Sequence, residues 1–289
     1  MYLVCFDGDA KLHFRYGITA VVGNVANLFG HTDDQCDIRG SVGSQFKSTG
    51  FVIIMYYDGA YYFGVSYETN DSPVVRFAPE TNEYCNIHLY KNDTDVIASL
   101  QNNENINYKR VSDLFNVNGR LYCALSVSYT DGKVTIEFFK MKDNRFEFCQ
   151  AFKGSGMQVN KLVKNQLVFN ADAVIGNSCY ISLGNLYKTD DFVHFSKISI
   201  PGNACVTDLW VDKSNGKEAL YALTTIENDS RFDNTIYRLD GEQLTEVFSF
   251  DYSCSALSFA KDNKYFYVSL GGDGAFSNDI GRVLKVELF

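Results

Sequence analysis

The sequence predicts an all-β fold in which a unit of four antiparallel strands is repeated and closed into a ring. The composition is typical of strands and turns, because 19 Tyr and 23 Phe accompany 22 Gly that are dispersed along the chain. No segment shows the apolar periodicity of an amphipathic helix. A strand centred on tyrosine recurs five times at intervals of 41 to 60 residues. We therefore expect residues 1–289 to form a single domain built from one repeated unit.

The recurring strand is the second strand of each unit. It begins at a turn signal and continues with aromatic, small and aliphatic residues, as a buried strand does. The five copies are DGAYYFGVSY (58–67), NGRLYCALSV (118–127), GNSCYISLG (176–184), KEALYALTT (217–225) and NKYFYVSLGG (263–272). An apolar inner strand precedes each copy: GFVIIMYY (50–57), RVSDLFNV (110–117), VFNADAVI (168–175), CVTDLWVD (205–212) and CSALSFA (254–260).

Two outer strands complete the unit as a hairpin. Residues 133–152 indicate two strands that turn at Asp143-Asn144, and residues 234–250 indicate two strands that turn at Asp240-Gly241. Asp-Gly is a dipeptide that tight hairpins favour. A chain of such antiparallel units shelters its sheet edges best when it closes as a ring.

The two ends of the chain are expected to complete each other. The last repeat offers three strands, ending with GRVLKVELF (281–289), and YLVCFDGDAKLHF (2–14) offers an N-terminal strand as the fourth. In this respect the chain resembles the β-propeller superfamily, whose members commonly close the ring with such a strand. The resemblance implies four-stranded antiparallel blades, and we prefer five. Residues 10–49 are irregular and hold five glycines, so a degenerate sixth blade is the alternative.

Bulk properties limit the partners and cofactors. A net charge of −9 repels phosphate backbones, so we expect no nucleic-acid partner. The chain lacks a run of about 18 apolar residues, which predicts no membrane span. The N-terminus MYLVCFDGD has no signal-peptide pattern, which indicates the cytoplasm or a virion as the location. No phosphate-binding loop, dinucleotide fingerprint or nucleophile elbow is present, so we expect no cofactor. The 4 His are far apart, and a metal stays unassigned.

A local motif lies in LYKTDDFVHFSKI (186–198). Thr189, Asp191, Phe192 and Phe195 occupy the places of S-x-D-L-x-x-W, a pattern frequent in five-bladed glycoside hydrolases, which the segment resembles. The segment also resembles the Asp-box of sialidase-type propellers, with Val193 in place of the glycine. Both resemblances imply a folding element rather than a catalytic centre. We expect the Asp191 carboxylate to accept backbone N–H bonds and fix a tight turn.

Three inner strands carry an acid at a similar place: Asp113 in VSDLFNV, Asp172 in NADAVIG and Asp208 in VTDLWVD. Glycoside cleavage needs two carboxylates around the scissile bond, one of them with a raised pKa. Resemblance to five-bladed glycosidases, which use acids from separate blades, makes these three residues catalytic candidates. The alternative is structural, because an Asp near a strand start often binds backbone amides or the next blade. Ile53 and Ala256 take the corresponding places in the other two inner strands.

Two functions are compatible with these features. We favour a non-catalytic β-propeller, a rigid module that binds a protein partner within a larger assembly, because no complete catalytic constellation is visible. The Tyr-rich and Pro-poor composition is typical of AT-rich microbial or viral genomes and fits a virion component. The alternative is a glycan-active propeller, a glycoside hydrolase or a lectin-like protein, that binds a carbohydrate through inner-strand carboxylates.

Overall fold

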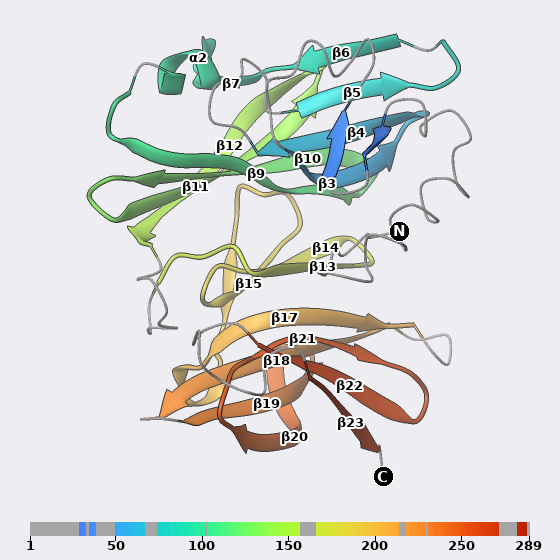
Figure 1. Cartoon of the computed structure of the whole chain (residues 1–289), viewed down its shortest axis with the longest axis vertical. Helices are drawn as coiled ribbons and strands as arrows, with labels where there is room; N and C mark the ends of the chain where they lie inside the picture. The colour runs from blue at the N-terminus through green and yellow to red at the C-terminus, as the bar shows by residue number, and fades with distance from the viewer. Residues whose placement is uncertain are drawn as a thin grey trace. The chain divides into compact units, whose positions relative to one another are not determined.

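A computed structural model shows that the chain is built from strands, which confirms the all-β prediction (Figure 1). The described residues are 29–32, 35–38, 50–66, 74–81, 83–101, 103–156, 166–213, 218–228, 231–271 and 282–287. Within these ranges, the helical elements are the six-residue helix α2 (Val96–Gln101) and the 3-10 turn η3 (Pro201–Asn203). Neither of them has the length and apolar character needed to cross a bilayer.

Five antiparallel sheets follow one another along the chain, four of them with four consecutive strands. The first comprises β3 (Gly50–Tyr57), β4 (Ala60–Ser66), β5 (Val74–Ala78) and β6 (Glu83–Ile87). The second comprises β9 (Ile106–Val117), β10 (Arg120–Tyr129), β11 (Lys133–Lys142) and β12 (Arg145–Ser155). The third comprises β13 (Ala171–Ile175), β14 (Ser178–Ser182), β15 (Leu186–Thr189) and β16 (Ser196–Ile198). The fourth comprises β17 (Cys205–Asp212), β18 (Ala219–Asn228), β19 (Arg231–Asp240) and β20 (Gln243–Tyr252). The fifth comprises β21 (Ala256–Lys261), β22 (Tyr265–Leu270) and β23 (Val283–Glu287).

Four shorter strands stand outside this scheme. β1 (Phe29–Thr32) and β2 (Gln35–Ile38) pair with each other. β7 (Leu89–Lys91) pairs with β12 and with β8 (Thr94–Asp95), and β4 touches β9 at Ser66 and Arg110. These contacts merge the first two sheets into one continuous arrangement of ten strands.

The predicted unit of an inner strand, a tyrosine strand and an outer hairpin matches the structure. The hairpin of β11 and β12 turns at Asp143-Asn144 as predicted, and both residues have positive φ angles of 51° and 60°. The hairpin of β19 and β20 turns one residue later than predicted, because Asp240 pairs with Gln243 and Gly241 takes the positive φ of 67°. Four-stranded antiparallel sheets of this kind are the blades of β-propellers.

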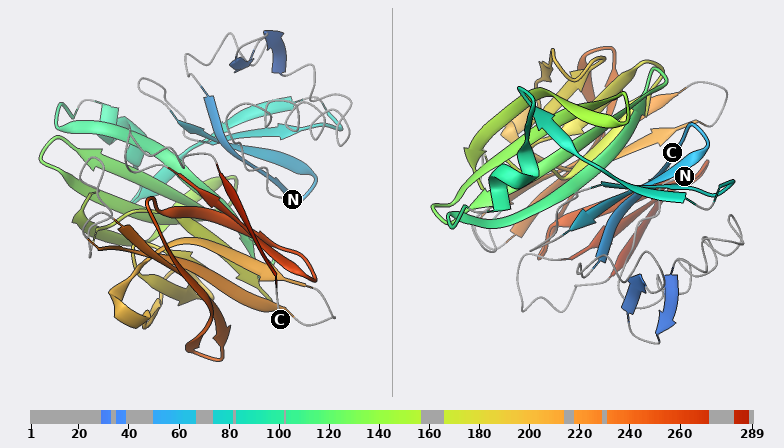
Figure 2. Two further views of the ribbon diagram at one scale, coloured as in Figure 1. Left: turned by 60° about the horizontal axis from the view of Figure 1, so that its bottom comes forward. Right: turned by 90° about the horizontal axis from the view of Figure 1, so that it is seen from above.

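The chain divides into two compact units. Unit 1 consists of Met1–Asp131 and Ile136–Ala151, and unit 2 consists of Gly132–Thr135 and Phe152–Phe289. In unit 1 the first and second sheets enclose one apolar core, in which Phe63, Leu114, Phe139 and Phe146 are buried. Figure 2 shows the long strands β9 to β12 of this unit as green neighbours.

Unit 2 has two apolar layers between its three sheets. Val206, Leu209 and Leu220 belong to the layer between the third and fourth sheets. Tyr221 and Phe266 belong to the layer between the fourth and fifth sheets, and their rings meet edge to face with centroids 5.6 Å apart. Trp210, the single tryptophan of the chain, packs against the second layer. Its fluorescence is therefore a probe for the folding of unit 2.

The expected closure of the ring falls largely outside the described residues. The fifth sheet has three strands, as the sequence predicts, and the segment 2–14 that is expected to supply the fourth is not described. Of residues 10–49, the structure describes β1 and β2 alone. Five blades, the six-blade alternative and a single domain over residues 1–289 therefore stay predictions.

Candidate functional site

Asp172 and Asp208, two of the three predicted candidates, both lie in unit 2. Asp172 belongs to β13 and Asp208 to β17, and these inner strands pack side by side. The side chains of Asn170 and Ser182 each donate a hydrogen bond of 2.8 Å to the carbonyl oxygen of Val206, which ties the third sheet to the fourth. Both residues are half-buried as a whole, but the Asp208 carboxyl group is largely enclosed and Asp172 Oδ2 is buried.

The environment of Asp208 favours its neutral form. Burial raises the pKa of Asp208 to about 6, the backbone N–H groups of Phe259 and Leu209 act in the opposite direction, and the charge of Asp172 adds to the rise. A carboxyl group that is still partly protonated near pH 6 is able to donate a proton. Asp172, whose charge acts on Asp208, supplies a second carboxyl group. Acid–base cleavage of a glycosidic bond needs at least such a pair.

The Asp208 carboxylate also holds the polypeptide backbone. Its Oδ1 accepts the N–H of Leu209 at 2.8 Å, and its Oδ2 accepts the N–H of Phe259 at 2.9 Å. Phe259 lies in β21, so this side chain connects the inner strands of the fourth and fifth sheets. The structural alternative that the sequence left open, an Asp bound to backbone amides and to the next blade, matches these contacts.

Asp113 lies in unit 1 and makes the same local bond. Its Oδ1 accepts the N–H of Leu114 at 2.7 Å, and the residue is 7% exposed. The structure brings Asp172 and Asp208 together within one unit and places Asp113 in the other. A joint catalytic role for all three acids stays a prediction.

The pairing registers distinguish Asp172 from the other two acids. Asp113 lies two residues before Phe115, the partner of Tyr122, and Asp208 lies two residues before Trp210, the partner of Tyr221. In both strands, the residue directly before the acid has no partner in the pairing register, and we call it a skipped residue. Asp172 lies one residue before the partner of Tyr180, in a ladder without such a skip. One step along a strand turns a side chain to the other face of the sheet, so Asp172 is not equivalent to Asp113 and Asp208.

Four inner strands each contain one residue that has no partner in the pairing register with the following strand. The skipped residues are Val52, Ser112, Thr207 and Leu257. A bulge of this kind bends the strand and redirects the following side chain. The residues that follow are Ile53, Asp113, Asp208 and Ser258. A carboxylate at this position binds the N–H of the next residue, which explains why the two equivalent acids make the same bond.

The motif of residues 189–195 is a tight turn, as predicted. Asp191 Oδ1 accepts the N–H groups of Val193 and His194, both at 2.8 Å, and its Oδ2 lies 2.8 Å from His194 Nδ1. Burial raises the pKa of Asp191, but the bonds from His194 and Val193 outweigh it and lower the pKa to about 2. Thr189 Oγ1 accepts the N–H of Phe192 at 2.9 Å, and Phe192 is buried with a φ of 59°. These contacts support a folding role for the motif.

Replacing Thr189 by valine is expected to destabilise unit 2 by about 1–3 kcal/mol, because the buried N–H of Phe192 then loses its acceptor. Urea denaturation followed by Trp210 fluorescence measures the change. Thr245→Val is the matched control, since Thr245 is exposed on β20 and we expect a change below about 0.5 kcal/mol. Equal effects of the two substitutions would contradict a special role for Thr189.

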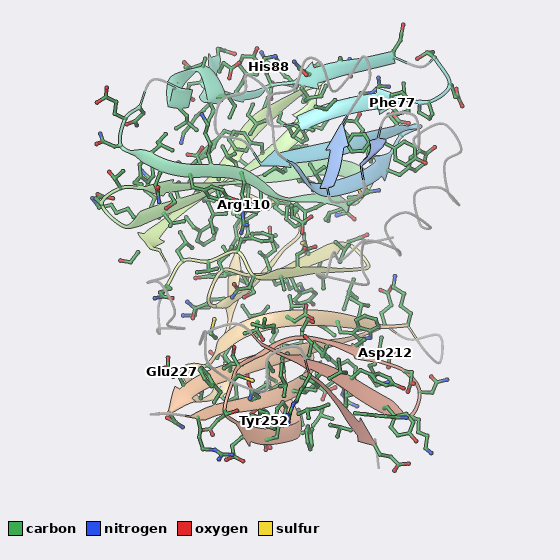
Figure 3. All side chains as sticks on the ribbon, viewed as in Figure 1. Phe77, His88, Arg110, Asp212, Glu227 and Tyr252 are labelled. Carbon is green, nitrogen blue, oxygen red and sulfur yellow. The ribbon has the colours of Figure 1, made fainter. Side chains whose placement is uncertain are left out.

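The sequence missed a buried ion pair in the same unit. Lys261 Nζ, in β21, lies 2.5 Å from Asp212 Oδ2, at the end of β17 (Asp212 is labelled in Figure 3). Asp208 and Asp212 thus attach one strand to β21 at two points. Asp212 ends the predicted inner strand 205–212, and Lys261 directly follows the predicted inner strand 254–260. Charges of opposite sign at neighbouring strand ends are the signal that indicates such a pair. Among the described residues, no group of His, Cys, Asp or Glu is arranged to hold a metal ion.

Comparisons with known proteins identify a fold resemblance. No protein-family model matches the chain, and no curated protein sequence matches it. A solved GH74 enzyme of Niastella koreensis is similar over 81% of this chain and 35% of that chain, with 17% identity and a TM-score of 0.46. A GH93 α-L-arabinofuranosidase of Fusarium graminearum, in complex with arabinobiose, is similar over 79% and 77%, with 11% identity and a TM-score of 0.44. The structure of the Dos1 propeller is similar over 83% and 62%, with 9% identity and a TM-score of 0.43.

The chain spans about a third of the length of the GH74 enzyme. The resemblance is to the β-propeller fold, which hosts many unrelated activities, so similarity at this level says nothing of the activity of this chain.

Proposed function

We propose that the chain is a glycan-active β-propeller whose chemistry is carried by Asp172 and Asp208. The observation that supports the proposal is the placement of these two largely buried carboxyl groups on neighbouring inner strands, with the pKa of Asp208 raised to about 6. A carboxyl group that keeps its proton to about pH 6, beside a second carboxyl group, is what acid–base cleavage of a glycosidic bond requires.

The two residues take different roles in this proposal. Asp208 keeps its proton up to about pH 6 and donates it to the leaving oxygen of the glycoside. Asp172 acts as the ionised partner, as a nucleophile or as the base that activates water. Activity is then expected to fall as the pH rises through the pKa of Asp208, because the protonated acid is lost.

Substitution of each carboxyl group tests the proposal on a panel of aryl glycosides. We expect Asp172→Asn and Asp208→Asn each to lower kcat by about 100- to 10,000-fold. Glycosides with a strongly activated leaving group need no acid, so they should restore turnover in Asp208→Asn and leave Asp172→Asn inactive. Asp113→Asn is the matched control, since Asp113 makes the same backbone bond in the other unit.

The absence of turnover by the wild type on the whole panel would refute the hydrolase. A lectin-like variant of the proposal then predicts binding of an unmodified oligosaccharide, measured by calorimetry and weakened by Asp172→Asn. Absence of both turnover and binding leaves no support for a glycan-active protein.

A second candidate function is a rigid module that binds a protein partner. This function is favoured by the hydrogen bonds that Asp113 and Asp208 accept from backbone N–H groups, because such bonds indicate a structural role for these acids. Tyr56 is 58% exposed near the end of β3, and its ring lies tilted against that of Tyr61 with centroids 5.0 Å apart. Exposed tyrosines commonly anchor interfaces. Capture of a partner from the native source that Tyr56→Ala weakens, together with an inactive wild type, would favour this function.

A further inference from the structure

The outer strand of the second sheet is covered by a segment that comes from an earlier part of the chain. β12 is 11 residues long and ends the antiparallel order β9, β10, β11, β12. An uncovered outer strand presents N–H and C=O groups that pair readily with another chain. Here residues 88–101, which we call the edge strap, comprise His88, β7, β8 and α2, and His88 and β7 lie along the outer side of β12.

The edge strap pairs with β12 through the backbone. Leu89 and Tyr90 of β7 run parallel to Phe146 and Glu147 of β12, and the Phe146 N–H donates to the His88 carbonyl at 2.9 Å. Parallel pairing is an exception in this antiparallel sheet, and two residues of β7, Leu89 and Tyr90, form it. His88, labelled in Figure 3, is also the only residue between β6 and β7. The strand that ends the first sheet therefore continues directly onto the edge of the second.

Apolar side chains fix the edge strap to the core of unit 1. Leu89 and Ile97 are 0% exposed and Val96 is 6% exposed, and all three belong to the core cluster that contains Phe146. The helix α2 is capped by Asp95, whose Oδ1 accepts the N–H groups of Ile97 at 2.9 Å and Ala98 at 3.3 Å. The helix cap and the buried side chains thus anchor the edge strap to the core of unit 1.

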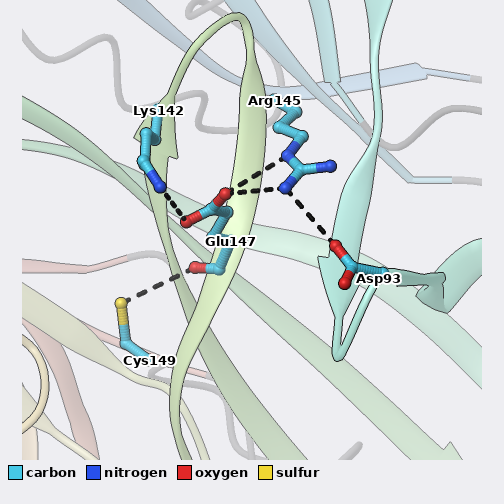
Figure 4. Close-up of polar contacts among 5 residues, drawn as sticks. All are labelled: Asp93, Lys142, Arg145, Glu147 and Cys149. Atoms are coloured by element: carbon cyan, nitrogen blue, oxygen red, sulfur yellow. Dashed lines mark hydrogen bonds and ion pairs between the residues drawn. The ribbon is translucent and has the colours of Figure 1, made fainter.

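Charged groups add a second set of contacts between the edge strap and the hairpin of β11 and β12. Figure 4 shows Arg145 between Glu147, at 2.9 Å, and Asp93 in the turn that joins β7 to β8, at 3.5 Å. On the other side, Lys91 Nζ lies 2.9 Å from Glu137 and 4.0 Å from the centroid of the Phe148 ring. These groups attach β7 and the turn that follows it to both strands of the β11–β12 hairpin.

The other long outer strand is protected in a different way. Among the described residues, no strand pairs with the outer side of β20, which is 10 residues long. Its pairing register skips Val247, and it carries Glu246 and Asp251. A bulge and charges discourage pairing at an edge. β12 carries charges as well, but its half next to the hairpin turn also holds Phe146 and Phe148, and this half is the part that the edge strap covers.

We propose that the edge strap is a built-in guard that prevents β12 from pairing with the β12 of a second copy of this chain. The covered half, residues 145–148, holds two phenylalanines and already pairs with a strand in parallel register. The strand most available to it at high concentration is the same edge of another copy.

The test weakens the ladder and leaves the core residues in place. Tyr90→Pro removes the N–H of Tyr90 from β7, whereas Tyr90→Ala keeps that N–H and serves as the matched control. In the full-length Tyr90→Pro chain, we expect amide exchange at residues 145–148 to rise by at least about tenfold at low concentration. We also expect its average mass in light scattering to increase with concentration beyond that of the wild type, and the exchange to slow again as the mass rises. Tyr90→Ala should behave like the wild type in both measurements.

Raised exchange at residues 145–148 with the mass of the wild type would overturn the proposal, since the edge would then be open and inert. Unchanged exchange would overturn it too, because β7 would not protect β12. Trp210 fluorescence checks that unit 2 keeps its fold. If Tyr90→Pro does not fold, Lys91→Ala with Asp93→Ala decides the matter, because it removes both ion pairs and should raise the exchange by about threefold and increase the mass.

Discussion

Replacing Lys261 by methionine is expected to lower the free energy of unfolding of unit 2 by about 3–5 kcal/mol. Lys261 Nζ lies 2.5 Å from Asp212 Oδ2, and the two side chains are only 9% and 16% exposed. Methionine fills a similar volume but leaves the Asp212 carboxylate without its counter-ion in a poorly solvated place. The substitution therefore removes one charge of a buried ion pair, and this costs much more free energy of unfolding than breaking an ion pair at the surface.

Trp210 reports this change directly, because it precedes Asp212 by two residues and packs in the same unit. Urea denaturation followed by its fluorescence gives the free energy of unfolding. Lys264→Met is the matched control, since Lys264 pairs with Glu287 at 3.2 Å but both side chains are at least half exposed, and we expect a change below about 1 kcal/mol. Adding Asp212→Asn to Lys261→Met should recover part of the loss. Equal effects of Lys261→Met and Lys264→Met would show that the pair is not buried in solution.

Local patterns predicted most of the strands because each strand is short, apolar and bounded by turn residues. The bounds of β3 and β17 match the predicted inner strands at 50–57 and 205–212. The single helix of the described residues, α2, has six residues, too few to display a helical period. Its one signal in the sequence is Asp95, which caps the helix.

Contacts between distant segments could not be predicted from the sequence. The parallel pairing of β7 with β12 joins residues that lie more than 50 positions apart, and a strand of three residues has no pattern of its own. The same holds for the bond between Asp208 and the Phe259 N–H. Sequence reasoning identified the acids, but their partners depend on which sheets pack together.

The predicted equivalence of the three acids failed for a local reason. The inner strands β9 and β17 contain a skipped residue before the acid and β13 does not, so acids at similar places in the predicted strands take different positions in the sheet. A bulge is set by the fit between two strands and is not readable from one of them.

The stability of unit 2 is expected to fall as the pH rises from about 4 to about 6, by about 1–3 kcal/mol through Asp208 alone. Burial raises the pKa of Asp208 from 3.8 to about 6 in the folded chain. Between these values the folded chain retains a proton that the unfolded chain has released. The contribution of Asp208 to stability is therefore fully present below about pH 4 and is lost as the pH passes through about 6.

Asp208→Asn isolates this contribution, because asparagine does not titrate. The free energy of unfolding of the variant minus that of the wild type, followed by Trp210 fluorescence, should increase by about 1–3 kcal/mol from pH 4 to pH 7, whatever its constant offset from the lost backbone bond. Asp191→Asn is the control with the opposite sign. The pKa of Asp191 is lowered from 3.8 to about 2, so its contribution is present above about pH 4 and is lost as the pH falls towards 2. A difference for Asp208→Asn that stays constant from pH 4 to pH 7 would mean that Asp208 titrates normally, and the proposed proton donor would lose its physical basis.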